Sequence, residues 1–399
     1  MFNQGYFGSE KRKFIYKAII MATTFLKVKA FTIIGFLACI GLTTMAQPHS
    51  HRLARAIKFP NVNGLYTLSA DLHQHTVFSD GSVWPDIRVQ EALKDGLDLI
   101  SLTEHLEYQP HKADIPHPDR NRSYELAIAE AKNHDLMVVK GAEITRRMPP
   151  GHCNAVFLTD ANGLLATDSL TPFEQANKQG AFVFWNHPNW TAQRKDGVAT
   201  LTPMHRDLIR RGWLHGIEVV NETTYSDEAL QIALDNNLTI MGTSDIHGLI
   251  DWMFEVPDGG HRPVTLVFAN QKTPEAVKQG LMERKTVVFF NDLLIGREEW
   301  VAPLAKASIT VDTAHYQGDS QVMLVKLSNQ SSCPFTLVNK SKYSFHDGAG
   351  VVKLPASGSV ELLVKTIQPL TSLALDFEVL NTITAPGKHA FIRIDCSLQ

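Results

Sequence analysis

The chain has 399 residues, of which 44% are hydrophobic and 20% are charged, a composition typical of folded globular proteins rather than disordered ones. Its length suits one large domain followed by a smaller one. The formal net charge of -3 provides no general basic field, so the composition disfavours nucleic acid as an obligate partner.

Residues 1–46 have the order of segments found in a secretory signal peptide. Two lysines precede an apolar run at 30–42, and small residues follow it. The run is shorter than the roughly 20 apolar residues that cross a bilayer, so we expect no transmembrane segment in the mature protein. A retained N-terminal anchor is the alternative. We therefore expect an exported protein, located in the bacterial periplasm or secreted, with a linker over 47–65 and with Met1 or Met21 as its start.

The region from 66 to 298 alternates short apolar runs with amphipathic stretches of helical periodicity. Such alternation is typical of βα units, so we expect a mainly parallel α/β barrel here, and the length of the region fits one. The apolar runs lie at 97–103, 136–144, 181–188, 216–223, 238–247 and 264–269, with helical stretches such as 85–96 and 273–284 between them.

The region from 304 to 399 contains short β-prone runs broken by glycine, proline, asparagine and serine. This pattern predicts a small all-β sandwich, and we expect it to serve in packing or docking because it carries no catalytic cluster. Cys333 and Cys396 both lie in this region. Export would permit a disulfide between them, and two unpaired buried thiols are the other interpretation.

Potential metal ligands recur at the ends of the apolar runs in the α/β region. His73 and His75 are two positions apart, so on a strand their side chains point to the same side. Two imidazoles aimed at one point, with Asp80 close behind, suit a metal ion better than a hydrophobic core. Because the C-terminal ends of parallel barrel strands meet on one face, we expect further strand-end residues to join them. These are Glu104, His105, Glu143, His152, His187, Asp245 and His247.

The motif order HxH, Asp, EH, Glu, His, NHP and DxH over residues 68–290 resembles the PHP superfamily, named after polymerase and histidinol phosphatase domains. The resemblance implies a distorted (β/α)7 barrel with two or three divalent metal ions. Glu104 stands where many members have Asp, so it is either a ligand or a residue that positions one, and some members have His in place of Asp80. The resemblance assigns His73, His75, Glu143 and Asp245 to the first metal, Glu143, His152 and His187 to the second, and Asp80, His105 and His247 to the third.

Within that superfamily, the chain is most similar to secreted bacterial phosphodiesterases of the Sb-PDE type. The features that carry this similarity are the predicted signal peptide, the motifs GHCN, FWNHP and IEVVN, and the β-rich C-terminal region. The resemblance therefore implies a phosphoric ester hydrolase, with a phosphodiesterase favoured over a phosphomonoesterase.

These residue types suit the hydrolysis of phosphate esters. Adjacent divalent cations lower the pKa of a shared water and neutralise phosphate oxygens, so we expect phosphodiester cleavage by attack of a metal-bridging hydroxide. A carboxylate can bridge two cations whereas an imidazole nitrogen binds one, which makes Glu143 the expected bridge. Nitrogen and oxygen ligands without thiolate favour Mn, Zn or Fe. His247 or Asp245 is the expected acid for the leaving group.

Four further residues are expected to bind a small-molecule phosphate ester. An arginine guanidinium can contact phosphate oxygens with two N–H groups, and an indole can stack on an aryl or nucleoside group. The candidates are Arg146, Arg147, Arg262 and Trp190.

Three other functions compete with phosphodiester hydrolysis. A phosphomonoesterase would use the same metal cluster. An amidohydrolase-like barrel that cleaves C–N or C–O bonds also begins with HxH and ends with Asp, but Asp80, His105 and His247 are surplus to that scheme. A non-catalytic binding protein would use the barrel as a scaffold, and the complete ligand set argues against it.

Overall fold

The structure is a computed structural model that describes residues 55–115, 117–348 and 350–398. The predicted signal peptide, both candidate start residues and most of the predicted linker lie outside the described residues. Within the described ranges, no helix is both long enough and apolar enough to cross a membrane.

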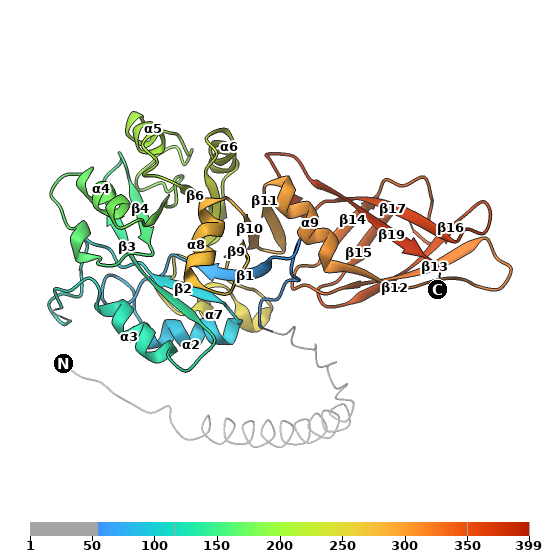
Figure 1. Cartoon of the computed structure of the whole chain (residues 1–399), viewed down its shortest axis with the longest axis horizontal. Helices are drawn as coiled ribbons and strands as arrows, with labels where there is room; N and C mark the ends of the chain where they lie inside the picture. The colour runs from blue at the N-terminus through green and yellow to red at the C-terminus, as the bar shows by residue number, and fades with distance from the viewer. Residues whose placement is uncertain (1–54, 116, 349, 399) are drawn as a thin grey trace, which may run out of the picture. The chain divides into compact units, whose positions relative to one another are not determined.

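The first part of the described chain is an α/β domain built on a curled β-sheet, in which parallel and antiparallel strand pairs are mixed (Figure 1). Its strands follow the order β18-β11-β10-β9-β1-β2-β3-β4-β5-β6-β7, and β8 pairs with β6 outside this path. The Thr265 hydroxyl of β9 accepts from the Gly242 N–H of β8 and donates to its carbonyl, which links these two strands through a side chain. The predicted distorted α/β barrel is confirmed. The strands are β1 (Tyr66–Asp71), β2 (Leu99–Leu102), β3 (Met137–Thr145), β4 (His152–Val156), β5 (Phe182–Trp185), β6 (Gly216–Asn221), β7 (Thr224–Tyr225), β8 (Thr239–Thr243), β9 (Val264–Ala269), β10 (Thr286–Phe290) and β11 (Leu293–Gly296).

Helices follow most of these strands, as the periodicity predicts. Thr202, Ser226 and Thr273 each start a helix by accepting a hydrogen bond from the backbone N–H three residues later. Four helices carry proline at their first or second position, where no intrahelical N–H is needed. The helices are α2 (Pro85–Asp95), α3 (Arg122–Ala131), α4 (Thr171–Lys178), α5 (Pro203–Arg210), α6 (Asp227–Asp235), α7 (Ile250–Met253), α8 (Pro274–Met282) and α9 (Glu298–Ser308), with short 3-10 turns η1 (Asn162–Leu164) and η2 (Val256–Asp258).

The expectation of a mainly parallel sheet is wrong for several neighbouring strands. β4 is antiparallel to both β3 and β5, and β9 is antiparallel to both β1 and β10. The β3–β4 connection spans only 146–151 and contains no helix, whereas a parallel crossover needs a dozen or more residues. The short connection places the first residue of β4 beside the last residue of β3, because Thr145 pairs with His152.

The C-terminal part is the all-β sandwich that the sequence predicts. One sheet has the order β12-β13-β16 and the other has the order β15-β14-β17-β19. Side chains along β13 and β19 alternate between buried and more exposed, and the buried ones from both sheets share a hydrophobic core. The strands are β12 (Ile309–Tyr316), β13 (Val322–Asn329), β14 (Phe335–Asn339), β15 (Val351–Leu354), β16 (Ser359–Lys365), β17 (Ser372–Val379) and β19 (Ala390–Ser397).

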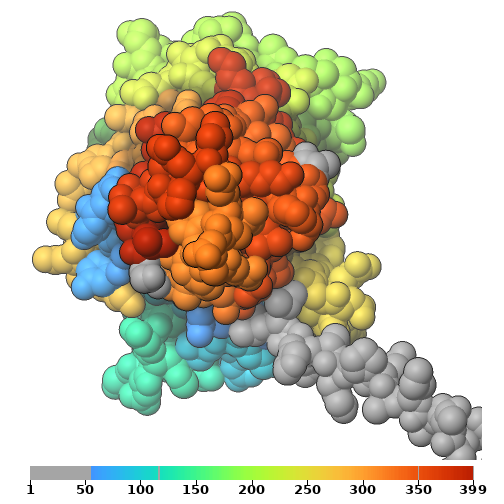
Figure 2. Space-filling view, turned by 90° about the vertical axis from the view of Figure 1, so that its right-hand side faces the viewer, coloured from blue at the N-terminus to red at the C-terminus, as the bar shows by residue number. Residues whose placement is uncertain are grey.

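A short strand from the C-terminal part joins the sheet of the α/β part. β18 (Thr382–Ile383) pairs in parallel with β11, and the Asn381 side chain donates to the Asp292 carbonyl at 2.7 Å. The hydrophobic core of the sandwich continues through Leu304 of α9 to Phe289 of β10. In the space-filling view, the C-terminal residues, coloured from orange to red, face the viewer (Figure 2).

The three cysteines in the described ranges, Cys153, Cys333 and Cys396, are buried free thiols. Of the two interpretations of Cys333 and Cys396, the structure therefore has the unpaired one. Burial raises the pKa of each thiol, so none has the character of an activated nucleophile.

Candidate metal centre

The strands of the α/β part bring the predicted ligands together at one edge of the sheet. His73 and His75 follow β1, His105 follows β2, and Asp245 follows β8. His152 opens β4, but it reaches the same edge because β4 runs antiparallel to β3. The predicted set that meets here is His73, His75, Asp80, His105, Glu143, His152, His187, Asp245 and His247.

The first group of side chains lies deepest in the cluster. The Nε2 atoms of His73 and His75 are 3.0 Å apart, and each lies 3.1 Å from Oδ1 of Asp245. The two carboxylate oxygens of Glu143 lie 3.8 Å from His73 Nε2 and 3.7 Å from His75 Nε2. All four side chains are fully or nearly fully buried.

The second group is built on the other side of the Glu143 carboxylate. Its Oε1 atom lies 3.0 Å from Nδ1 of His152 and 3.7 Å from Nε2 of His187. The same carboxylate therefore lies within 4 Å of side chains of both groups. The Asn186 side-chain amide donates to Oε1 at 2.9 Å and holds the carboxylate in place.

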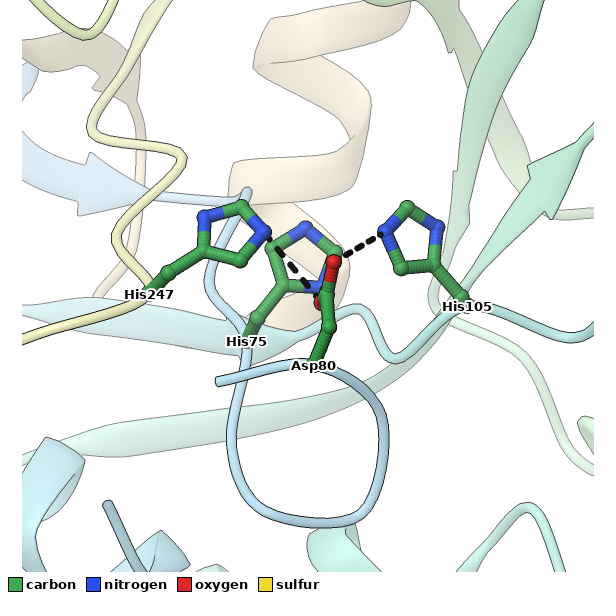
Figure 3. Close-up of side chains that lie close together, drawn as sticks. All are labelled: His75, Asp80, His105 and His247. Atoms are coloured by element: carbon green, nitrogen blue, oxygen red, sulfur yellow. Dashed lines mark ion pairs between the residues drawn. The ribbon is translucent and has the colours of Figure 1, made fainter. Parts of the chain in front are cut away.

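The third group surrounds Asp80 (Figure 3). Asp80 Oδ1 lies 3.2 Å from Nε2 of His247, and Asp80 Oδ2 lies 3.3 Å from Nε2 of His105. The turn that carries Asp80 packs so closely that a Cβ atom on Gly81 would lie 2.6 Å from the carbonyl carbon of His75. A larger residue at position 81 would therefore push Asp80 away from the cluster.

Hydrogen bonds at Nδ1 leave Nε2 of three imidazoles directed at the cluster. His73 Nδ1 lies 2.7 Å from Glu218, His247 Nδ1 lies 2.8 Å from the Asp245 carbonyl, and His75 Nδ1 lies 3.3 Å from the Ser79 hydroxyl. When Nδ1 donates to these partners, the lone pair of each ring is on Nε2. This is the tautomer that binds a cation on the cluster side.

Several buried polar atoms of the cluster form no hydrogen bond in the described part of the chain. Buried polar groups in folded proteins are normally satisfied, so a concentration of such atoms at one place indicates a missing partner. The atoms are carboxylate oxygens and imidazole nitrogens, with no thiolate among them, and these atom types bind divalent cations. The residues present therefore fit a multi-metal site. The atoms are Asp80 Oδ1, Glu143 Oε2, His152 Nδ1, His187 Nδ1 and Asp245 Oδ1.

The electrostatics of the cluster also favour the binding of cations. Burial opposes a charge on His73, but the carboxylates of Asp245 and Glu218 outweigh it and raise the pKa of His73 to about 10. Burial likewise opposes a charge on His105, and the Glu143 carboxylate outweighs it and raises the pKa of His105 to about 11. The carboxylates thus provide negative charge that protons balance in the absence of cations, and cations would replace those protons.

Glu218 in β6 is a site residue that the sequence analysis did not identify. Its carboxylate accepts from His73 Nδ1 at 2.7 Å, the His187 backbone N–H at 2.7 Å and the Thr243 hydroxyl at 2.6 Å. It also accepts from the Asn221 side-chain amide, which donates in turn to Asp245. A charged residue inside the apolar run 216–223 was the available signal.

Glu104 supports the cluster from outside. Its carboxylate accepts from the Thr76 hydroxyl at 2.6 Å and from the Ser79 hydroxyl at 2.5 Å. Because Ser79 donates to Glu104, its oxygen is free to accept from His75 Nδ1. Of the two roles that the resemblance leaves open for Glu104, the structure supports positioning of a ligand.

Arg88, a buried arginine, ties together the two segments that carry most of the first group. Its Nε donates to the His75 carbonyl at 3.0 Å and its Nη2 donates to the Ile246 carbonyl at 3.2 Å. The His75 backbone N–H also donates to the Ile246 carbonyl, at 3.0 Å. Arg88 pairs with Glu91 at 2.7 Å, so its own charge is balanced.

Arg262 is not placed to bind substrate, which corrects the expectation from sequence. It is 1% exposed and pairs with Asp71 at 3.1 Å and Asp95 at 2.7 Å. Asp71 also accepts from the N–H and hydroxyl of Ser244, the residue before Asp245. The guanidinium therefore stabilises the strand ends beneath the cluster instead of facing solvent.

The cluster opens into a cavity of about 160 Å³. Trp190 lines this cavity, whereas Arg146 and Arg147 do not. Arg146 pairs with Glu107 at 2.9 Å and donates to the Ala166 carbonyl. The structure thus places one of the four predicted substrate contacts at the cavity. Its lining comprises Asp80, His105, Glu143, His152, His187, Trp190, Asn221, Glu222, Asp245 and His247.

Comparison with known proteins identifies each part of the chain. Residues 309–395 match the DUF5001 family, described as an Ig-like domain. No curated protein sequence matches the chain. Two solved structures match the chain at low sequence identity. They are a candidate metal-dependent phosphoesterase from Bifidobacterium adolescentis and an amidohydrolase from Chromobacterium violaceum with bound sulfate and no metal. The first is 17% identical to this chain with a TM-score of 0.36, and the match covers 45% of this chain and 88% of the other. The second is 14% identical with a TM-score of 0.33, and the match covers 45% of this chain and 87% of the other.

A crystal structure from Bacteroides vulgatus is similar over both parts. It is a two-domain protein containing a predicted PHP-like metal-dependent phosphoesterase, 38% identical to this chain with a TM-score of 0.79. The match covers 85% of this chain and 98% of the other. The chain therefore belongs to the family of two-domain proteins that contain a PHP-like metal-dependent phosphoesterase domain.

Proposed function

We propose that the protein hydrolyses phosphodiesters with two or three divalent cations, Mn, Zn or Fe, held by the predicted ligand set. The observation that carries this proposal is the convergence of nitrogen and oxygen donors around Glu143, with buried oxygens that lack hydrogen-bond partners. When bound, such cations polarise phosphate oxygens and make water a nucleophile near neutral pH. The protein's own residues contribute by holding and orienting the nitrogen and oxygen atoms that would bind these cations.

Two supporting residues would set the geometry for that chemistry. Asn186 fixes the Glu143 carboxylate between the first two groups. Glu218 fixes His73 in the tautomer that presents Nε2, and its bond to the His187 backbone couples the first group to the second. Because these contacts are buried, the donors are held in place before substrate arrives.

The charge of the cavity wall favours a diester over a monoester. Among the described lining residues there is no lysine or arginine, and Glu222 adds a carboxylate. A phosphomonoester carries a second negative charge near neutral pH, and the wall offers no side-chain cation to balance it. A diester carries one negative charge, which the proposed cations suffice to balance.

Membership of the Sb-PDE type and export from the cytoplasm are part of the same proposal. They are supported by the motifs GHCN, FWNHP and IEVVN and by the order of basic, apolar and small residues in 1–46. Fractionation of cells that express the full chain would test export. The mature protein is expected outside the cytoplasm with its N-terminus near residue 47, and a full-length cytoplasmic chain would contradict export.

The activity is tested with protein freed of metal and reconstituted separately with Mn, Zn or Fe. We expect faster hydrolysis of bis(4-nitrophenyl) phosphate than of 4-nitrophenyl phosphate, and loss of turnover with a chelator. Glu143→Gln should be inactive, while Glu174→Gln on the exposed face of α4 should match the wild type. Cleavage of the monoester alone would overturn the choice of a diester, and cleavage of neither would overturn the proposed function.

A further inference from the structure

The cavity contains side chains that the proposed metal sites do not use. After the predicted ligands are set aside, its lining consists of Trp190, Asn221 and Glu222. Asn221 is already committed, because its side-chain amide donates to Glu218 and Asp245. Trp190 and Glu222 remain free to contact a substrate bound at the cluster.

Glu222 contributes a half-buried carboxylate that has no partner in the described part of the chain. Its backbone N–H donates to the Thr243 carbonyl, and its φ of 50° lies in the left-handed region that non-glycine residues rarely adopt. This φ is that of the first residue of the two-residue turn between β6 and β7, because Asn221 pairs with Thr224. The turn after β6 places this carboxylate at the cavity wall, and the described lining residues include no lysine or arginine.

Trp190 contributes an aromatic surface beside the second group. Its ring lies 5.1 Å from the His187 ring and 5.6 Å from the His152 ring, centroid to centroid, which anchors the indole in the wall. The residue is nevertheless 46% exposed, so part of the indole remains available. An indole together with a carboxylate is a combination that recognises ammonium groups through cation–π attraction and charge.

The size of the cavity limits what such a group can be. Its volume of about 160 Å³ is below the roughly 300–1,000 Å³ of ordinary small-molecule pockets. A phosphate and one compact substituent fit this space better than a nucleoside does. The volume therefore favours a compact substituent for the group that lies inside the cavity.

We infer that the substrate is a phosphodiester in which one ester group carries a compact ammonium, of the choline or ethanolamine type, recognised by Trp190 and Glu222. This inference rests on the proposed function. In the hydrolysis, a water oxygen forms a new bond to phosphorus and the bond from phosphorus to one ester oxygen breaks. The leaving oxygen keeps the electron pair and the other ester group stays on the phosphate. The water's proton is released to solvent or taken up by the leaving oxygen.

The test uses two esters that differ in one charge. 4-Nitrophenyl phosphorylcholine carries a trimethylammonium group, and 4-nitrophenyl 3,3-dimethylbutyl phosphate carries a tert-butyl group of the same shape. For the metal-reconstituted wild type we expect kcat/KM to be at least about tenfold higher for the cationic ester, mainly through KM. An equal or lower kcat/KM for the cationic ester would overturn the inference.

Variants show which residues produce the preference. Glu222→Gln and Trp190→Leu should each bring the ratio of the two kcat/KM values toward about 1, whereas Glu222→Asp should keep most of it. Glu275→Gln, an exposed carboxylate on α8, should leave the ratio at the wild-type value. A Glu222→Gln protein that is folded by thermal melting and retains the full ratio would overturn the assignment of Glu222.

The same assay separates failure of the inference from failure of the proposed function. If the wild type cleaves bis(4-nitrophenyl) phosphate and does not prefer the choline ester, the inference fails and the phosphodiesterase stands. If it cleaves none of the three esters with any reconstituted metal, the proposed function fails and the inference fails with it.

Discussion

Replacement of Glu218 by glutamine should weaken metal binding without unfolding the protein. One oxygen of Glu218 accepts from His73 Nδ1 and the Thr243 hydroxyl, and the other accepts from the His187 N–H and the Asn221 amide. The last two groups can only donate, so the glutamine oxygen must face them. Its NH2 group then faces His73 and Thr243, both of which can accept a hydrogen bond.

The consequence is a change of tautomer at His73. When Nδ1 accepts from the glutamine, the ring proton moves to Nε2, and the lone pair that would bind a cation is lost. Loss of such a supporting contact typically costs about 10–100-fold in metal affinity, or about 1.4–2.8 kcal/mol. Because only the Thr243 hydroxyl loses its acceptor, the free energy of unfolding of the metal-free protein should fall by about 1 kcal/mol.

Metal-free wild type, Glu218→Gln and the control Glu174→Gln should be titrated with Zn²⁺ or Mn²⁺ against a competing chelator. We expect the dissociation constant to rise for Glu218→Gln alone, with a melting temperature close to that of the metal-free wild type. If Glu218→Gln binds the cation as tightly as the wild type does, the role assigned to Glu218 is wrong.

Three further predictions follow from the same geometry. His187→Ala should lose metal from the second group and at least about 100-fold in kcat/KM while keeping its circular dichroism spectrum, and full turnover with unchanged metal content would count against that group. Removing metal with a chelator should lower the melting temperature, since a cation at 100 times its dissociation constant stabilises the fold by about 2.7 kcal/mol, and an unchanged melting temperature would contradict this. Arg262→Met should cost about 3–5 kcal/mol in urea denaturation because Asp71 and Asp95 lose a buried partner, and a cost below about 1 kcal/mol would contradict the stabilising role assigned to Arg262.

The fold was predictable because its signals are local. Alternating apolar runs and helical stretches identify the α/β part, and short β-prone runs with turn residues identify the sandwich. Strand direction was harder to predict. Apolar runs look alike whether their strands are parallel or antiparallel, and the orientation of β4 depends on the short 146–151 connection. The pairing of β18 with β11 depends on contact between segments far apart in the chain, for which the sequence has no local signal.

The arrangement of the candidate ligands was predictable because they follow motifs at strand ends. The supporting residues were not, since their roles depend on partners distant in sequence. Glu218 occupies one position in a buried apolar run, and its importance appears only when His73 lies beside it. An arginine such as Arg262 is a residue type that often contacts phosphate. Its burial against Asp71, which only the structure shows, excludes that role.

The central claim is that the side chains around Glu143 hold cations. The most direct measurement is anomalous X-ray diffraction, at the Mn, Zn and Fe absorption edges, from crystals of the active protein. We predict at least two anomalous peaks within coordination distance of Glu143, one next to His73 and His75 and the other next to His152 and His187. A map from active protein with no anomalous peak at this carboxylate would contradict the account.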